Sequence, residues 1–290
     1  MQSKFREYIT LCKPRVVLLM LLTTWAGMYL ASFHPIPWSL WINTTLGVAL
    51  MSGASATFNH IIDQRIDAIM ARTQKRPLVT GALSSHEAWI FACVQTLIGF
   101  LILYFAVNPL TAILTSLAAI GYAIVYSLYL KRATSQNIVI GGLSGAMPPL
   151  LGWTAVSNHL APEAWLLVLI IFTWTPAHFW ALCLHRLQEY KKAAIPMLPV
   201  THGVSFTKLH IVLYSFLTAA CSLLPFAIGM SGMLYLVSAV VLNVGLLVYA
   251  FKLQFAADYS HLALRTFHYS LVYLTGLFIV ILLDHHLLIN

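Results

Sequence analysis

Long apolar runs alternate with short polar segments along almost the whole chain. A helix needs about 20 mainly apolar residues to cross the hydrocarbon core of a membrane, where a backbone must satisfy its own hydrogen bonds. Counting such runs between polar breaks predicts nine transmembrane helices. They lie at residues 16–33, 38–58, 88–107, 110–130, 138–156, 164–184, 209–228, 233–255 and 267–283. We therefore expect an all-α, polytopic membrane protein, one domain over residues 1–290, with a central cavity that opens near the cytoplasmic face.

The composition agrees with a chain embedded in lipid. Of its 290 residues, 60% are hydrophobic and only 8% are charged, whereas an ordinary soluble domain has about 25% charged residues. The net charge of +8 does not indicate a nucleic-acid partner, because the basic residues lie beside the apolar runs and not in one soluble module. The cysteines have no paired spacing, so we expect free thiols. They are Cys12, Cys93, Cys183 and Cys221.

The basic residues also predict the orientation, because cytoplasmic loops collect Lys and Arg. With nine spans, all 16 of them fall on one side of the membrane. This places the N-terminus in the cytoplasm and the C-terminus outside, in a bacterial-type plasma (inner) membrane. The first run is long for a signal-peptide core and lacks a clear cleavage site, so we interpret it as a retained span.

Long cytoplasmic loops follow the second and sixth runs, and each begins with a carboxylate just past an apolar helix. This pattern suggests duplicated four-helix halves, about 11–132 and 138–255, followed by a final helix at 267–283.

Three polar residues at the cytoplasmic end of the second run form the main candidate site. Asn59, Asp63 and Asp67 follow one another at intervals of four residues, so an α-helix places them on one face. Carboxylate and amide oxygens suit magnesium, which proteins usually hold together with substrate phosphates and water. The spacing therefore predicts a site for metal and diphosphate, with all three residues as ligands.

Basic residues near these acids strengthen the interpretation, because they can contact the phosphate oxygens that a metal leaves uncovered. The candidates are Arg72, Lys75, Arg76, Lys131 and Arg132. The alternative is a solvated cluster of salt bridges at a helix end. Charged groups at membrane depth are costly and tend to mark functional sites, which favours the functional interpretation.

A further carboxylate, Glu189, follows the sixth run and lies close to one helical face with His178 and His185. Two acidic helix ends facing each other would let two magnesium ions clamp one diphosphate. Loss of an allylic diphosphate would leave a carbocation, which aromatic faces stabilise. Tyr122, Tyr126 and Tyr129 on the fourth run are candidates for such a wall, and simple packing is the alternative.

The segment 59–73, NHIIDQRIDAIMART, followed by KRPL, resembles the first aspartate motif of the intramembrane aromatic prenyltransferase superfamily. Further segments resemble its heme O synthase family. They are SQNIVIGG at 135–142, GAMPP at 145–149, GW at 152–153, WTPAHFWAL at 174–182 and IPMLPV at 195–200. The resemblance runs from about residue 11 into the final span.

This resemblance implies transfer of farnesyl from farnesyl diphosphate to a vinyl group of heme B, with water addition, giving heme O for terminal oxidases. It assigns metal and diphosphate binding to the residues named above. It assigns His178 to the heme end of the cavity, where we also place Trp153 and His185. For His178 a hydrogen bond between helices is the alternative to heme. Heme-modifying enzymes and oxidase assembly factors are expected partners.

The sequence departs from the family pattern at two loop positions: Glu189 stands where the family usually has Asp, and Ala194 where it usually has Gly. Three rival functions stay open. A sister enzyme would prenylate a quinone precursor, with a different pocket around Pro148, Trp153 and His178. A transporter would place its acids near the midplane, and a non-catalytic heme-handling factor would not need the three α-helical ligands together.

Overall fold

The computed structural model describes residues 4–289, the side chains of 288 and 289 excepted, and its secondary structure is helical. The element between α5 and α6 is a π-helix, here called η1. The helices are α1 Lys4–Leu11, α2 Pro14–Leu30, α3 Trp38–Asp67, α4 Ser85–Ala106, α5 Pro109–Ile120, η1 Gly121–Leu130, α6 Lys131–Ala133, α7 Asn137–Ala146, α8 Pro148–Ser157, α9 Pro162–His185, α10 Leu187–Lys192, α11 Leu198–Thr201, α12 Gly203–Ala227, α13 Met233–Phe255 and α14 Ser260–Ile289.

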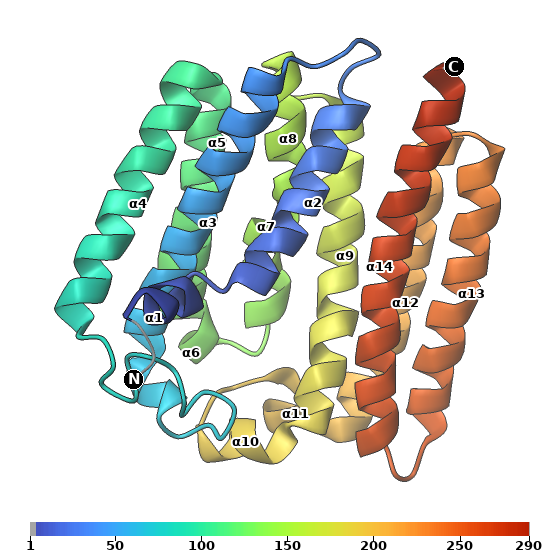
Figure 1. Ribbon diagram of the computed structural model, residues 1–290. Coiled ribbons are helices and arrows are strands. Elements are labelled where there is room, and N and C mark those ends of the chain that lie inside the picture. Colours follow the sequence, from blue (N-terminus) through green and yellow to red (C-terminus); the bar gives the residue numbers. More distant parts are fainter. Residues whose placement is uncertain (1–3, 290) are drawn as a thin grey trace.

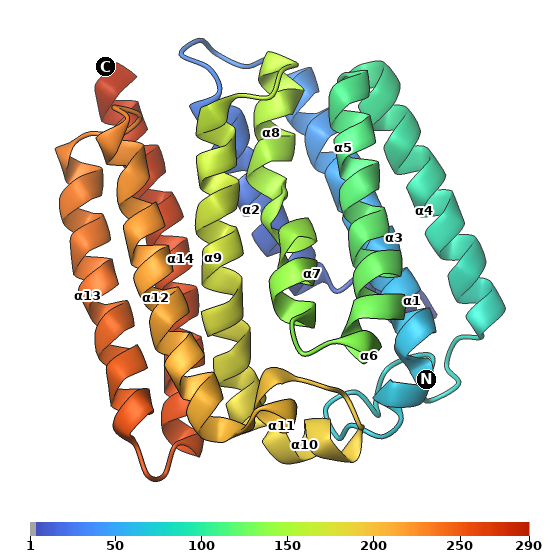
Figure 2. The same ribbon diagram turned by 180° about the vertical axis from the view of Figure 1, so that it is seen from behind.

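The long helices run side by side in one bundle (Figure 1). Helices α12, α13 and α14 form one flank, α3, α4 and α5 form the other, and α2, α8 and α9 lie between them (Figure 2). The short helices α1, α6, α10 and α11 gather at one end, together with the C-terminal end of α3, and α14 ends at the opposite end. The residues of the candidate site thus lie at the end that carries the longer connections.

Within residues 4–289, seven helical segments are long and apolar enough to cross a membrane, and they match the last seven predicted runs. An eighth segment is added if α1 and α2, bent by 48° at their junction, count as one span. Helix α3, with 30 residues, is long enough but does not reach the same hydropathy. Its polar residues, which include Asn59 and Asp63, lower its mean hydropathy. A membrane-spanning helix can carry these two because they face the protein interior instead of lipid.

Prolines and side-chain caps set several helix boundaries. Pro148 lacks a backbone N–H and begins α8 directly after α7, so the predicted run 138–156 is one crossing made of two helices. Asn108 caps α5 by accepting a hydrogen bond from Thr111 N at 2.8 Å. Ser84 and Glu87 form a reciprocal capping box at the start of α4.

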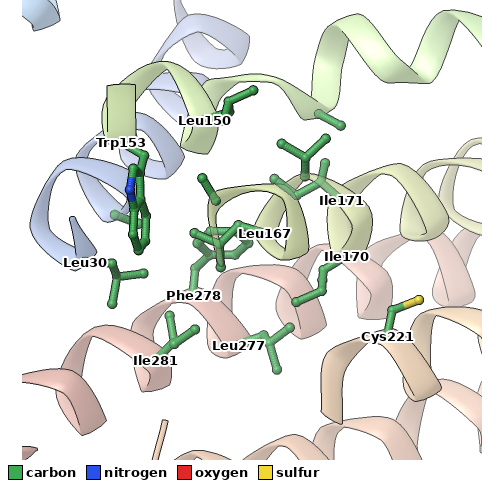
Figure 3. Packing of buried hydrophobic residues seen from close by; sticks show 14 of the residues in the cluster. Leu30, Leu150, Trp153, Leu167, Ile170, Ile171, Cys221, Leu277, Phe278 and Ile281 are labelled. Carbon is green, nitrogen blue, oxygen red and sulfur yellow. The ribbon is translucent and has the colours of Figure 1, made fainter. Parts of the chain in front are cut away.

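The largest buried cluster joins α2, α7, α8, α9, α12, α13 and α14 away from the acids of α3 (Figure 3). Leu167, Ile170 and Phe278 lie at its centre, and Trp153 packs against the same group. Helices α2 and α8 approach so closely that a Cβ at Gly27 would meet Pro149 O and one at Gly152 would meet Thr24 O. Only glycine fits at these two crossings, which explains the GW pair of the sequence motif.

Candidate active site

The last turns of α3 carry the three predicted ligands in buried positions. Asn59, Asp63 and Asp67 are 4%, 1% and 3% exposed. An isolated buried carboxylate is unstable, so partners from other segments must neutralise it. The structure supplies an arginine or lysine partner for each carboxylate, and a lysine also contacts the Asn59 amide.

Asp63 lies at the centre of this cluster. Its Oδ2 accepts hydrogen bonds from Lys131 Nζ at 2.6 Å and from Asn59 Nδ2 at 2.7 Å. Its Oδ1 is buried and has no hydrogen-bond partner within the described part of the chain. Lys13 Nζ donates to Asn59 Oδ1 at 2.6 Å. One carboxylate oxygen is therefore free for a ligand that the protein does not itself provide.

Lys13 is a member of the cluster that the sequence analysis does not predict, because the basic residues near the N-terminus serve there only to predict the orientation in the membrane. It lies at the bend between α1 and α2, with φ at 51°, and its Nζ is 3.4 Å from Tyr122 Oη and 5.9 Å from the centre of that ring. The signal was the pair Lys13-Pro14, since a proline at the first helical turn fixes where α2 begins and what stands before it.

Replacing Lys13 by Met is expected to lower kcat/KM for the diphosphate substrate that the sequence resemblance implies by about 10- to 100-fold, the effect of one charge-assisted hydrogen bond. The loss should appear mainly as a higher KM for the diphosphate substrate. Lys4→Met is the matched control, because Lys4 forms an exposed pair with Glu87 at 2.9 Å and exposed pairs contribute little. Equal kinetics of the two variants would remove Lys13 from the site.

A third basic partner comes from the loop after α3. Arg76 forms an ion pair with Asp67, whereas Arg72 and Lys75 are exposed in the same loop. Burial raises the pKa of the Tyr190 hydroxyl, and the positive charge of Arg72 acts in the opposite direction. Met70, in the loop after α3, and Tyr190, on α10, pack in one buried cluster, so the two predicted cytoplasmic loops meet at this end.

The π-helical segment η1 positions side chains opposite α3. Ser127 Oγ accepts from Asn59 Nδ2 at 2.9 Å and donates to Tyr122 O, five residues earlier, at 2.9 Å. Tyr122 and Tyr126 stack with their ring centroids 5.7 Å apart. Tyr129 is 67% exposed and does not join them. The predicted three-tyrosine wall assumed an α-helical turn, and the wider π-helical turn rotates Tyr129 to the outside.

Glu189 lies at the same end of the bundle as α3, on α10 (Figure 2). Its Oε1 pairs with Arg186 Nη1 at 2.7 Å, and its Oε2 is buried without a partner in the part of the chain described. Arg132, from α6, donates to Ile62 O at 3.2 Å. It lines a small pocket of about 270 Å³ together with Arg65 and residues 193–195.

Ala194, one of the two departures from the family pattern, adopts φ 52°. A side chain costs about 1–2 kcal/mol in this left-handed region. Ala194→Gly is expected to raise the free energy of unfolding by about 0.5–1 kcal/mol, less than the full cost because glycine gains freedom in the unfolded chain. Thermal unfolding in detergent measures this change.

The matched control for that measurement is Ala193→Gly, because Ala193 has φ −81° and should lose stability when replaced. A lower unfolding temperature for Ala194→Gly than for the unaltered protein would contradict the strain.

An apolar cavity of about 580 Å³ begins at this cluster and runs between the helices. Lys13 and Tyr122 line one part of it and His178 lines another. Trp153 and His185, which were assigned to the same end, are not among the lining residues within 4–289. Trp153 belongs to the buried cluster of Figure 3, and His185 Nδ1 lies 3.1 Å from Ser260 Oγ at the start of α14.

The side chains fit magnesium only in company with a phosphate ligand. Among residues 4–289, no three His, Cys, Asp or Glu side chains come together in a way that holds a metal ion on their own. Asp63 and Asp67 with the Asn59 amide nevertheless form an oxygen donor set, and Asp63 Oδ1 is unpartnered. Magnesium is commonly bound by one or two carboxylates plus substrate phosphates, which is the arrangement these residues can complete.

Residues 20–272 match the UbiA prenyltransferase family, so the chain belongs to this family. Its curated relatives include protoheme IX farnesyltransferase 1 of Pseudomonas putida, 54% identical over 100% of this chain and 97% of the relative. Protoheme IX farnesyltransferase of Legionella pneumophila is 56% identical over 97% and 96%. At this identity and coverage, the chain groups with the protoheme IX farnesyltransferases.

Solved structures show the same fold at low identity. A digeranylgeranylglyceryl phosphate synthase superposes with a TM-score of 0.82 over 98% of this chain and 99% of its own, at 16% identity. A UbiA homologue from Archaeoglobus fulgidus bound to DMAPP and Mg²⁺ has a TM-score of 0.69 over 95% and 99%, at 18% identity. The bundle is therefore a UbiA-type fold.

Proposed function

We propose that this protein transfers the farnesyl group of farnesyl diphosphate to a vinyl group of heme B, with addition of water, to give heme O. The observation that carries the proposal is the buried row of Asn59, Asp63 and Asp67, neutralised by lysine and arginine, beside an apolar cavity that His178 also lines. The names of the curated relatives support the choice of heme as acceptor.

The reaction forms one carbon–carbon bond and one carbon–oxygen bond from water, uses up the π bond of the vinyl group and breaks the carbon–oxygen bond to diphosphate. A vinyl carbon of heme bonds to the first carbon of farnesyl as diphosphate leaves with the bonding electron pair. Water then bonds to the neighbouring vinyl carbon and loses a proton, which completes a hydroxyethylfarnesyl group. The protein must therefore stabilise a departing anion and hold an apolar chain and a porphyrin together.

The α3 cluster binds the leaving group. Asn59, Asp63 and Asp67 would hold magnesium, and Glu189 would contribute from α10 to a second ion. When bound, these ions neutralise charge on the departing diphosphate. Lys13, Lys131 and Arg76, which pair with the α3 side chains in this structure, turn to phosphate oxygens when substrate enters. Arg72, Lys75 and Arg132 supply further contacts from the rim.

The apolar cavity holds the farnesyl chain and excludes water from it. Tyr122 lines the cavity next to Lys13, so its ring face lies where positive charge develops on the allylic carbon. Tyr126 supports that ring by stacking on it. His178 faces the porphyrin, while Trp153 and His185 shape the helices around the acceptor without lining the cavity.

The proposed topology has nine crossings, with α3 and the bent α1–α2 pair added to the seven apolar helices. The longer connections and the N-terminal end of α1 then face the cytoplasm, and α14 ends outside, in an inner membrane. The central cavity opens toward the cytoplasmic face, and the single domain descends from two four-helix halves, about 11–132 and 138–255. A terminal-oxidase assembly factor or heme-modifying enzyme takes the product.

Mass analysis of products tests the function. Purified protein is incubated with magnesium, farnesyl diphosphate and heme B, and we expect heme to gain farnesyl plus water. A quinone precursor offered in parallel serves as the competing acceptor. Prenylation of that precursor, with heme unchanged, would assign the chain to a sister enzyme of the same family.

A further inference from the structure

His178 is held in one orientation by two aromatic side chains that stack on its ring. Its ring centroid lies 4.1 Å from that of Trp174, with 19° between the planes, and 4.4 Å from that of Phe267, with 26° between them. Because the imidazole is stacked on both faces, the plane of the ring is fixed. Its two nitrogens therefore point in defined directions.

Ser270, on α14, determines which of those nitrogens carries the proton. Its Oγ donates to Phe267 O at 2.7 Å, and His178 Nδ1 lies 2.6 Å from the same Oγ. A hydroxyl has only one proton to donate. Since that proton is directed to the carbonyl, Oγ accepts from His178 Nδ1–H, and the neutral imidazole keeps its lone pair on Nε2.

The serine is itself fixed in place. Ser270 is 2% exposed, and its backbone oxygen accepts a hydrogen bond from Trp174 Nε1 at 2.9 Å. Trp174 is one helical turn before His178 on α9, so the same pair of residues joins α9 to α14 and orients the imidazole. The tautomer is thus set by the packing of two helices.

The other nitrogen is available to a ligand. Over residues 4–289, Nε2 of His178 has no hydrogen-bond partner, and His178 lines the cavity that Lys13 and Tyr122 also line. A neutral imidazole whose Nδ1–H is held by a second group is the usual form of a metal-binding histidine, because that hydrogen bond orients the ring and makes the ligand more basic.

We infer that Ser270 is a positioning residue for the acceptor: it directs the Nε2 lone pair of His178 into the cavity, where it binds the iron of heme B as an axial ligand. The inference rests on the proposed function in taking heme B as the acceptor. It adds a residue from α14 whose hydroxyl acts through His178 and does not contact the substrate.

The experiment uses the full-length protein in lipid nanodiscs with heme B and without farnesyl diphosphate. Heme affinity is measured by absorption titration, and the iron–histidine stretching frequency of ferrous heme by resonance Raman spectroscopy. His178→Ala should lose the histidine-ligated spectrum, and added imidazole should restore it. Ser270→Ala should weaken heme binding about 10- to 100-fold, as loss of an outer hydrogen bond to a metal ligand does, and lower the stretching frequency.

Ser270→Thr keeps the hydroxyl, so its heme affinity and its iron–histidine stretching frequency should stay close to those of the unaltered protein. Thr266→Val is the matched control, because within the described residues the Thr266 hydroxyl bonds only to Leu262 O on its own helix, at 2.8 Å. A stretching frequency and affinity unchanged in Ser270→Ala, or a histidine-ligated spectrum that survives His178→Ala, would overturn the inference alone. Failure of the unaltered protein to bind heme here, together with failure to farnesylate it in the separate product assay with farnesyl diphosphate, would instead contradict the proposed function.

Discussion

Asp63→Asn is expected to lower farnesyl transfer by about 10²–10³-fold or more, the usual effect of removing one group that stabilises developing charge. Asn keeps the size of the side chain and a carbonyl oxygen but removes the negative charge. The Oδ1 of Asp63 is the buried oxygen without a partner in the described structure, so we expect it to be the oxygen that binds the ion. Initial rates of heme O formation, measured by mass, check this result.

The control must separate lost chemistry from lost folding. Lys131 is largely buried, and Asp63→Asn removes its ion-pair partner. Breaking a buried ion pair lowers the free energy of unfolding by about 3–5 kcal/mol. The double variant Asp63→Asn with Lys131→Met removes that unpaired charge and should regain unfolding temperature without regaining activity. Asp258→Asn, an exposed carboxylate between α13 and α14, should leave rate and stability unchanged. Activity that returns with stability in the double variant would reject the metal-binding role.

Removal of divalent cations is expected to have the second large effect, a reversible loss of roughly 10³-fold or more in rate. Without a cation, the diphosphate faces the carboxylates of Asp63 and Asp67, and like charges repel. Excess EDTA should stop turnover, and added magnesium should restore it. Heme affinity should not change in EDTA, since the cavity around His178 is apolar. Turnover that persists in EDTA would contradict a metal-dependent leaving group.

Two features of the fold follow directly from local rules. To predict that Asn59, Asp63 and Asp67 share one face, only their four-residue spacing and α-helical periodicity are needed. The prediction holds because α3 is regular through Asp67. To predict the transmembrane helices from the apolar runs, only the length of a membrane span is needed. The spans beginning at Ser85 and later match seven predicted runs because each is bounded by polar residues, a cap or a proline.

Other features depended on tertiary contacts that local sequence rules do not give. The π-helix of η1 moves Tyr129 outward and brings Ser127 to Asn59, and no periodicity in the sequence signals that change of turn. Lys13 enters the cluster because α1 and α2 are bent by 48°. Trp153, expected near the acceptor, packs in the buried cluster of Figure 3, where Gly152 allows α8 to approach α2, and Phe278 of this cluster lines the cavity that Trp153 does not reach.

The oxygens of α3 are expected to bind a divalent ion only when a diphosphate completes its coordination. Electron paramagnetic resonance of Mn²⁺, a hard cation that accepts the same oxygen ligands, tests this directly. The signal of bound Mn²⁺ should appear when farnesyl diphosphate is added to the unaltered protein, and it should be lost in Asp63→Asn but not in Asp258→Asn. Equal binding of Mn²⁺ by Asp63→Asn, with or without the diphosphate, would contradict the account.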